Sequence, residues 1–147
     1  MEYLKKILLI EDDKKDIELT ISALGENHLA NKVIVIQDGE KALEYLFKCS
    51  TSDARPDDLP AVILLDLKMP KVDGIQILKQ IKGHEKLKVL PVVILTSSRE
   101  SRDIEECYAL GVNAYVVKPV KFTEFVEAVK GLGVFWALIN EPPPSLK

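Results

Sequence analysis

Five short hydrophobic runs, separated by longer stretches of mixed polarity, divide this chain of 147 residues. Each run is rich in Val and Ile and is apolar throughout, without alternation between apolar and polar positions. Unbroken runs of this kind are typical of strands in a parallel sheet that is covered on both faces. The five predicted strands are Lys6–Ile10, Lys32–Ile36, Ala61–Asp66, Pro91–Thr96 and Ala114–Lys118.

The stretch after each run carries apolar residues at the spacing of an amphipathic helix. In the first stretch, for example, Ile17, Ile21 and Leu24 share one side. The predicted helices are Lys14–Leu24, Gly39–Phe47, Asp73–Lys82, Ser101–Leu110 and Phe122–Ile139. Because strand and helix alternate five times, we expect a doubly wound α/β fold with right-handed crossovers.

The length of the chain fits one domain with a substantial core. We expect residues 1–140 to form that domain and residues 141–147, which include three consecutive prolines, to form a tail without an output domain. The segment Lys48–Pro60 is expected to be a long polar loop that contains Cys49. Cys49 and Cys107 show no metal-binding or redox spacing, so we expect both to be reduced thiols.

Composition and charge exclude several classes of protein. Hydrophobic residues make up 47% of the chain and charged residues 29%, which is ordinary for a globular protein. The net charge is −3 and no basic stripe is evident, so we expect no direct contact with nucleic acid. The first apolar run is too short for a signal peptide and no window approaches a transmembrane span. We therefore expect a cytoplasmic protein without a membrane anchor.

Polar and charged residues that could take part in chemistry stand at the carboxyl ends of four of the five predicted strands. In open α/β sheets, ligands bind at the carboxyl ends of the strands. Carboxylates gathered at that edge repel one another and need a cation, and an oxygen-only ligand set favours Mg²⁺. A metal ion, a lysine and a hydroxyl around one aspartate can hold a phosphoryl group, and the aspartate itself can be the nucleophile. These residues are Glu11-Asp12-Asp13, Asp66, Thr96 and Lys118.

This set of residues resembles the receiver domain of two-component response regulators over about residues 5 to 130. The resemblance is carried by Glu11-Asp12, the segment "DLKMPKVDG" that begins at Asp66, Thr96 with a small residue after it, and Lys118-Pro119. It implies a flavodoxin-like fold, with a five-stranded parallel sheet in the order 2-1-3-4-5 and helices on both faces. It also implies a signalling module that catalyses only its own phosphorylation and dephosphorylation.

The resemblance assigns the metal and phosphoryl chemistry to four residues. Asp66 is expected to accept a phosphoryl group from a histidine of a sensor kinase. Asp12 and Asp66 are expected to bind Mg²⁺ directly, with Glu11 acting through a water molecule and Lys68 through its backbone carbonyl. Asp13 is the less favoured ligand, because the preceding apolar strand ends at Ile10.

The resemblance also implies a switch around the phosphoryl group. Lys118 is expected to pair with the phosphoryl oxygens, and Thr96 to move toward them while Tyr115 rotates. The bond before Pro119 is expected to be cis, an isomer that only an X-Pro bond adopts at modest cost. Lys68 and Ser98 occupy positions that influence how long the acyl phosphate lasts.

The last predicted helix has more apolar surface than a core stripe requires. One face carries Phe125, Val129, Leu132, Trp136 and Ile139, so we expect Trp136 to pack in the core. The opposite face becomes apolar in its final turns, at Val134, Phe135 and Leu138. An exposed helix end that is apolar all round suggests burial against a partner.

The end "FWALINEPPP" resembles single-domain regulators that accompany phytochrome-type histidine kinases and dimerise through the fourth helix, fifth strand and fifth helix. We therefore expect a homodimer that uses Phe135 and its neighbours, and a kinase of that type as partner. The alternative is that the proline tail covers this end of the helix. Downstream, either a histidine phosphotransfer protein or a directly bound effector fits a chain of this kind.

Two other functions compete with the signalling module. A Mg²⁺-dependent hydrolase with an aspartyl-phosphate intermediate usually has a second aspartate two residues after the nucleophile, where this chain has Lys68. A receiver-like binding module that is never phosphorylated would not need the complete set of site residues that this chain has.

Overall fold

The computed structural model describes residues 6–25, 32–51, 59–118, 122–136 and 140–141. Five parallel strands form one sheet in the order β2-β1-β3-β4-β5, which confirms the predicted topology. β1 lies between β2 and β3, so that Ile7 pairs with both Val33 and Val62. The strands are β1 (Ile7–Ile10), β2 (Val33–Ile36), β3 (Val62–Leu65), β4 (Val92–Thr96) and β5 (Ala114–Val117).

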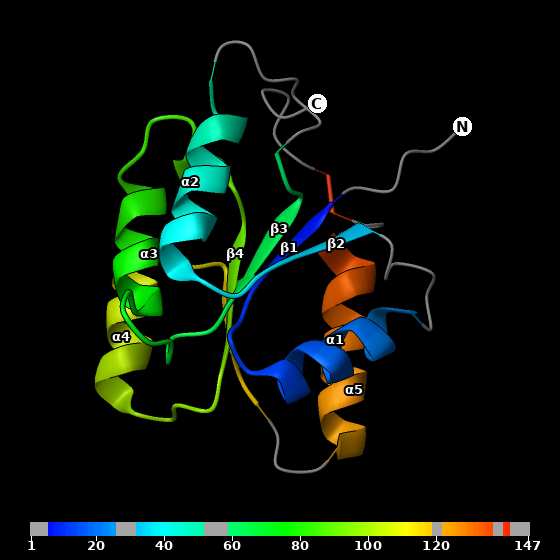
Figure 1. Cartoon of the computed structure of the whole chain (residues 1–147). Helices are drawn as coiled ribbons and strands as arrows, with labels where there is room; N and C mark the ends of the chain where they lie inside the picture. The colour runs from blue at the N-terminus through cyan, green and yellow to red at the C-terminus, as the bar shows by residue number, and fades with distance from the viewer. Residues whose placement is uncertain (1–5, 26–31, 52–58, 119–121, 137–139, 142–147) are drawn as a thin grey trace.

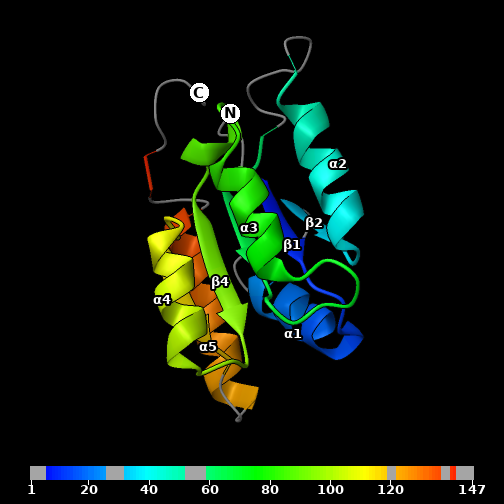
Figure 2. The same cartoon turned by 90° about the vertical axis from the view of Figure 1, so that its left-hand side faces the viewer.

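Helices cover both faces of the sheet. Figure 1 shows α2, α3 and α4 on one face and α1 and α5 on the other, and Figure 2 views the first of these layers from outside. Among the described residues, none of the helices is both long enough and apolar enough to cross a membrane. The helices are α1 (Lys14–Gly25), α2 (Gly39–Cys49), α3 (Gly74–Lys82), α4 (Ser101–Ala109), α5 (Phe122–Val134) and the short 3-10 helix η3 (Leu87–Val89).

The unbroken apolar strands are explained by two separate cores. Side chains of a strand point alternately to opposite faces of the sheet. In β1, Leu8 and Ile10 pack on the side of α2, α3 and α4, while Ile7 and Leu9 pack on the side of α1 and α5. β1, β3 and β4 are buried along their whole length, whereas the edge strands β2 and β5 are only half-buried.

One predicted boundary was wrong by more than one residue. Lys48 and Cys49 belong to α2 and not to the following loop, because the helix continues until the backbone N–H of Ser50 bonds to the carbonyl of Leu46 (3.1 Å). The α-helical part of α5 ends at Val134, and Phe135 and Trp136 continue it with the wider turn of a π-helix. The N–H of Asn140 donates to the carbonyl of Phe135 (2.7 Å). The predicted end at Ile139 lies outside the described residues.

Candidate functional site

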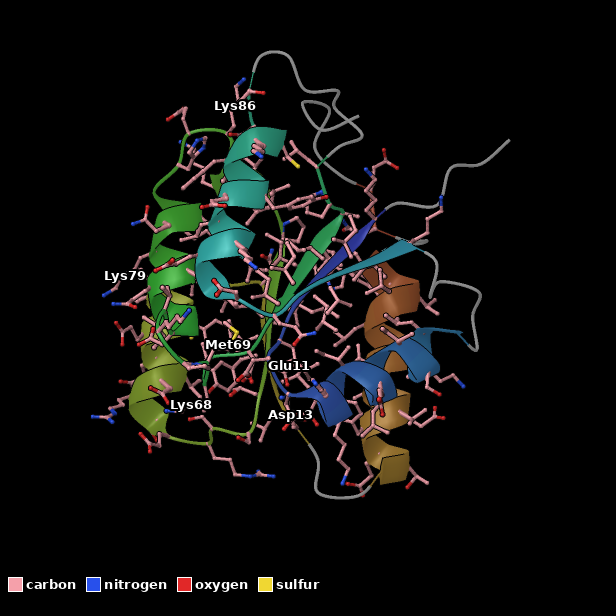
Figure 3. All side chains as sticks on the ribbon, in the orientation of Figure 1. Glu11, Asp13, Lys68, Met69, Lys79 and Lys86 are labelled. Carbon is pink, nitrogen blue, oxygen red and sulfur yellow. The ribbon has the colours of Figure 1, made fainter. Side chains whose placement is uncertain are left out.

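The carboxyl ends of the strands bring the predicted site residues to one edge of the sheet. Glu11 follows β1, Asp66 follows β3, Thr96 ends β4 and Lys118 follows β5. Backbone hydrogen bonds continue past the strands, from Asp66 N to Ile10 O (3.1 Å) and from Lys118 N to Thr96 O (2.7 Å). The main chain that carries these side chains is therefore held by the sheet itself. Figure 3 shows Glu11 and Lys68 at this end of the molecule.

Three carboxylates meet at this edge. Glu11, Asp12 and Asp66 each offer an oxygen atom, and these atoms lie within 4.8 Å of one another. Glu11 and Asp66 are buried, whereas Asp12 is half-buried. Burial, together with the neighbouring Asp66 carboxylate, raises the pKa of Glu11 to about 9. The site therefore accumulates negative charge that burial makes costly.

The donor set fits a hard divalent cation. Among the described residues, Glu11 Oε2 is the one buried side-chain oxygen or nitrogen atom that has no hydrogen-bond partner. A buried polar atom without a partner is costly, and a cation close to it would remove that cost. Carboxylate oxygens without His or Cys suit Mg²⁺ or Mn²⁺ better than a softer metal.

Lys118 supplies the positive charge of the site. Its ammonium donates to Asp16 Oδ2 at 2.6 Å, to Glu11 Oε1 at 2.7 Å and to Asp66 Oδ2 at 3.4 Å. Burial alone would lower the pKa of Lys118, but the hydrogen bonds to Asp16 and Glu11 outweigh it and raise that pKa above its ordinary value. Lys118 is therefore a fixed cation beside Asp66.

Asp16 is a member of this site that sequence reasoning missed. It lies in the first turn of α1, five residues after Glu11. An acidic residue at the start of a helix is explained well enough by the helix dipole, so the sequence carries no signal that it contacts Lys118. The neighbouring Asp13 has that ordinary role, because its carboxylate accepts the N–H of Asp16 (3.0 Å) and caps the helix.

The loop between β4 and α4 is tied down by buried hydrogen bonds. Thr96 is fully buried, and its hydroxyl accepts the N–H of Ser98 (3.4 Å). The Ser98 hydroxyl donates to Asp103 Oδ2 (2.6 Å), and the Tyr115 hydroxyl donates to the Ser98 carbonyl (3.0 Å). Asp103 was also missed, because its place in the first turn of α4 again suggests a dipole role. Thr96 and Tyr115, the two predicted switch residues, thus contact the same loop residue.

The turn between β3 and α3 packs closely against the backbone of Asp66. A Cβ atom on Gly74 would lie 2.3 Å from the Asp66 carbonyl oxygen and 2.7 Å from Leu67 Cα. Only glycine fits there without movement of the main chain. Asp73 caps α3 through the N–H of Gln76 (3.0 Å), and the Gln76 side chain accepts the N–H of Asp73 (3.3 Å). The N–H of Lys68 donates to Asp66 Oδ1 at 3.4 Å.

The structure describes two of the three predicted interface residues. Val134 is half-buried, and Phe135 is 46% exposed with its ring edge-on to Trp136 at 4.9 Å. Trp136 packs against the core on the side of α1 and α5, as the sequence predicts. Leu138 and the cis-proline candidate Pro119 lie outside the described residues.

The fold and the acidic edge together place this molecule among doubly wound α/β proteins with a cluster of carboxylates at the carboxyl ends of the strands. The model of the response regulator receiver domain matches residues 7–130, and the chain belongs to this family. Response regulator Rcp1 from Synechocystis sp. is 36% identical over 132 residues, which cover 90% of this chain and 88% of Rcp1. The chain is therefore a phosphorylatable signalling module, and the hydrolase alternative is not favoured.

Solved structures of similar regulators agree with this fold. The phosphorylated cyanobacterial phytochrome response regulator RcpA is 37% identical, with a TM-score of 0.85 over 96% of this chain and 99% of RcpA. The bacteriophytochrome response regulator RtBRR is 55% identical, with a TM-score of 0.71 over 97% of this chain and 86% of RtBRR. A structure of Rcp1 with bound Mn²⁺ has 34% identity and a TM-score of 0.83 over 95% of this chain and 99% of Rcp1.

Proposed function

We propose that Asp66 accepts the phosphoryl group, from a phosphohistidine of a sensor kinase. The observation that carries this proposal is the position of Asp66, buried at the sheet edge between the Glu11 and Asp12 carboxylates and the Lys118 ammonium. Of the carboxylates at this edge, Asp66 alone comes from the central strand that lies next to both β1 and β4. Side chains at the ends of both neighbouring strands, β1 and β4, can therefore reach Asp66.

The transfer exchanges one bond to phosphorus for another. A carboxylate oxygen of Asp66 forms a bond to phosphorus as the bond between phosphorus and the histidine nitrogen breaks, and the imidazole retains the electron pair. Lys118 pairs with the phosphoryl oxygens as negative charge builds up on them. The Thr96 hydroxyl offers a further hydrogen bond after the transfer.

Mg²⁺ is the metal ion that we propose for this site. Asp12 and Asp66 would bind it directly, Glu11 through a water molecule and Lys68 through its backbone carbonyl. The oxygen-only donor set and the unpaired Glu11 Oε2 support this assignment, as does the Mn²⁺ bound in the similar Rcp1. A bound divalent ion would offset the negative charge of the phosphoryl group.

The switch that we propose runs from Thr96 to Tyr115. Both contact Ser98, so movement of Thr96 toward the phosphoryl group would disturb the loop before α4 and release the Tyr115 hydroxyl. The changed surface would favour one set of partners over another.

A phytochrome-type histidine kinase is the partner that we propose, because RcpA is named as a phytochrome response regulator and RtBRR as a bacteriophytochrome response regulator. Such a kinase would place this chain in the cytoplasm. Residues 1–140 would act as the switching unit, which passes its signal to a histidine phosphotransfer protein or an effector.

A homodimer through the end of α5 also belongs to this proposal. The exposed Phe135 supports it, since large exposed aromatic side chains are common at protein interfaces.

The phosphorylation proposal is tested by incubation with Mg²⁺ and a small acyl phosphate, followed by intact-mass measurement. The wild-type protein should gain one phosphoryl group and Asp66→Asn none. Asp38→Asn is the matched control, because Asp38 follows β2 and caps α2 through the N–H groups of Glu40 and Lys41, a role that Asn also fills. It should be labelled like wild type. Equal labelling of Asp66→Asn and wild type would refute the assignment.

A further inference from the structure

The Lys118 ammonium is saturated by carboxylates. An ammonium group has three N–H donors, and three different carboxylates accept them. The distances are unequal: Asp16 and Glu11 lie at 2.6 and 2.7 Å from Nζ, whereas Asp66 lies at 3.4 Å. The two short hydrogen bonds therefore determine where the ammonium sits, and the contact with the phosphoacceptor is the weakest of the three.

Asp16 is the most exposed of the three carboxylates that bind Lys118. Its side chain is 27% exposed, compared with 3% for Glu11 and 9% for Asp66. Its backbone is fixed at both polar atoms, because its N–H donates to the Asp13 carboxylate and its carbonyl accepts the Thr20 hydroxyl (2.7 Å). Asp16 is thus a rigid anchor on α1 that draws Lys118 toward the rim of the site.

The other two partners of Lys118 are Glu11 and Asp66, which belong to the three carboxylates proposed to hold the metal ion. If Asp16 were removed, the free donor of Lys118 would turn to the nearest remaining carboxylates, Glu11 and Asp66. The ammonium would then compete with a divalent cation for the same oxygens, and the site would also lose one negative charge. Both effects weaken metal binding.

We propose that Asp16 is a positioning residue, which holds Lys118 away from Asp66 so that the carboxylates remain free for the metal ion and the ammonium remains ready for the phosphoryl group. This inference rests on the proposed function of the site. It assigns to α1 a direct part in setting the affinity of the site.

Titration with Mn²⁺ alone, followed by electron paramagnetic resonance, tests the inference without a phosphodonor. Asp16→Asn keeps the shape of the side chain and should weaken Mn²⁺ binding by about fivefold, an effect of the size that coupled residues in one network show. Glu18→Gln is the matched control, because it removes the same charge from an exposed position on α1. The control should change the affinity by less than about twofold.

The same substitution in a Lys118→Met background separates positioning from a general effect of charge. If Asp16 acts through Lys118, Asp16→Asn should weaken Mn²⁺ binding less in this background than it does with Lys118 present, because only the loss of charge remains. An undiminished loss in that background would overturn the inference.

A measurement without metal examines the ammonium itself. Hydrogen bonding slows proton exchange, so the metal-free protein should show a ¹H–¹⁵N signal of an ammonium that disappears in Lys118→Met. Asp16→Asn should broaden or remove this signal, and Asp16→Ala should do the same if the first variant folds poorly. An unchanged signal in both variants would overturn the inference. If wild type bound no Mn²⁺, the proposed function would fail instead.

Discussion

The Glu11 carboxylate combines burial, an ion pair and an oxygen atom without a hydrogen-bond partner. Its pKa of about 9 means that the metal-free site holds a proton at neutral pH. A divalent ion must displace that proton, because the metal and the proton are stabilised by the same negative charge. Protonation of Glu11 thus links metal binding to pH.

Metal affinity should therefore rise with pH until about 9, where Glu11 loses its proton without help from the metal. Below that pH, the dissociation constant for Mg²⁺ should fall by up to about tenfold per pH unit, the limit for release of one proton. Calorimetric titration between about pH 6.5 and 9.5 measures this slope. Glu11→Gln, which cannot titrate, should bind more weakly and with little dependence on pH; the same slope in this variant would contradict the assignment to Glu11.

Gly74 shows how a single added methyl group could displace Asp66, the proposed phosphoacceptor. Gly74→Ala would place a methyl group against the backbone of Asp66 and Leu67, which cannot rotate away. We expect a loss of about 3 kcal/mol in the free energy of unfolding and slower phosphorylation of Asp66. Urea unfolding and intact-mass kinetics measure the two effects.

Gly131 provides the matched control for Gly74. A Cβ atom there meets nothing within 4 Å, and the residue lies in α5. Gly131→Ala should stabilise the protein by up to about 1 kcal/mol and leave the phosphorylation rate unchanged. Equal losses of stability in the two variants would show that close packing at Asp66 is not the cause.

At the scale of elements, α4 is connected to the site through its first turn. The buried Asp103 accepts the Ser98 hydroxyl, and Ser98 also contacts Thr96 and Tyr115. The start of α4 is therefore held by the same loop that would move on phosphorylation. Lys68, which lies two residues after Asp66, approaches Asp103 at 3.7 Å and adds a weak link to the turn before α3.

Ser98→Ala should loosen this connection. Loss of a hydrogen bond to a charged and buried partner should reduce the free energy of unfolding by about 2 kcal/mol. Amide hydrogen exchange should increase most in residues 101–104, the first turn of α4. Ser97→Ala is the control, since Ser97 is exposed, and it should leave exchange unchanged. Uniform exchange along α4 in both variants would contradict the link.

At the scale of the whole molecule, the features of the fold that burial determines could be predicted from the sequence. Continuous Val- and Ile-rich runs can satisfy two cores only in a covered parallel sheet, and parallel strands place Glu11, Asp66 and Lys118 at one edge without further information. The contacts of Asp16 and Asp103 depend on the direction in which a helix starts relative to that edge. Helix periodicity does not contain this direction, so the sequence does not connect either residue with the site.

The end of α5 shows the same limit for surfaces. The core stripe of Phe125, Val129 and Trp136 follows from periodicity, and the structure confirms it. The opposite side leaves Phe135 46% exposed. Periodicity identifies such a residue as surplus to the core, but it does not identify the partner that covers it.

If that partner is a second copy of the chain, Phe135→Glu should abolish the dimer, because it would bury a charge at the interface without a partner. Sedimentation velocity at high micromolar concentration, with and without a phosphoryl mimic such as beryllofluoride, measures the oligomeric state. Val89→Glu is the matched control: Val89 is 41% exposed and lies on η3, away from α5. It should sediment like wild type. A monomeric wild type under both conditions would refute the dimer, and an unchanged dimer in Phe135→Glu would place its interface elsewhere.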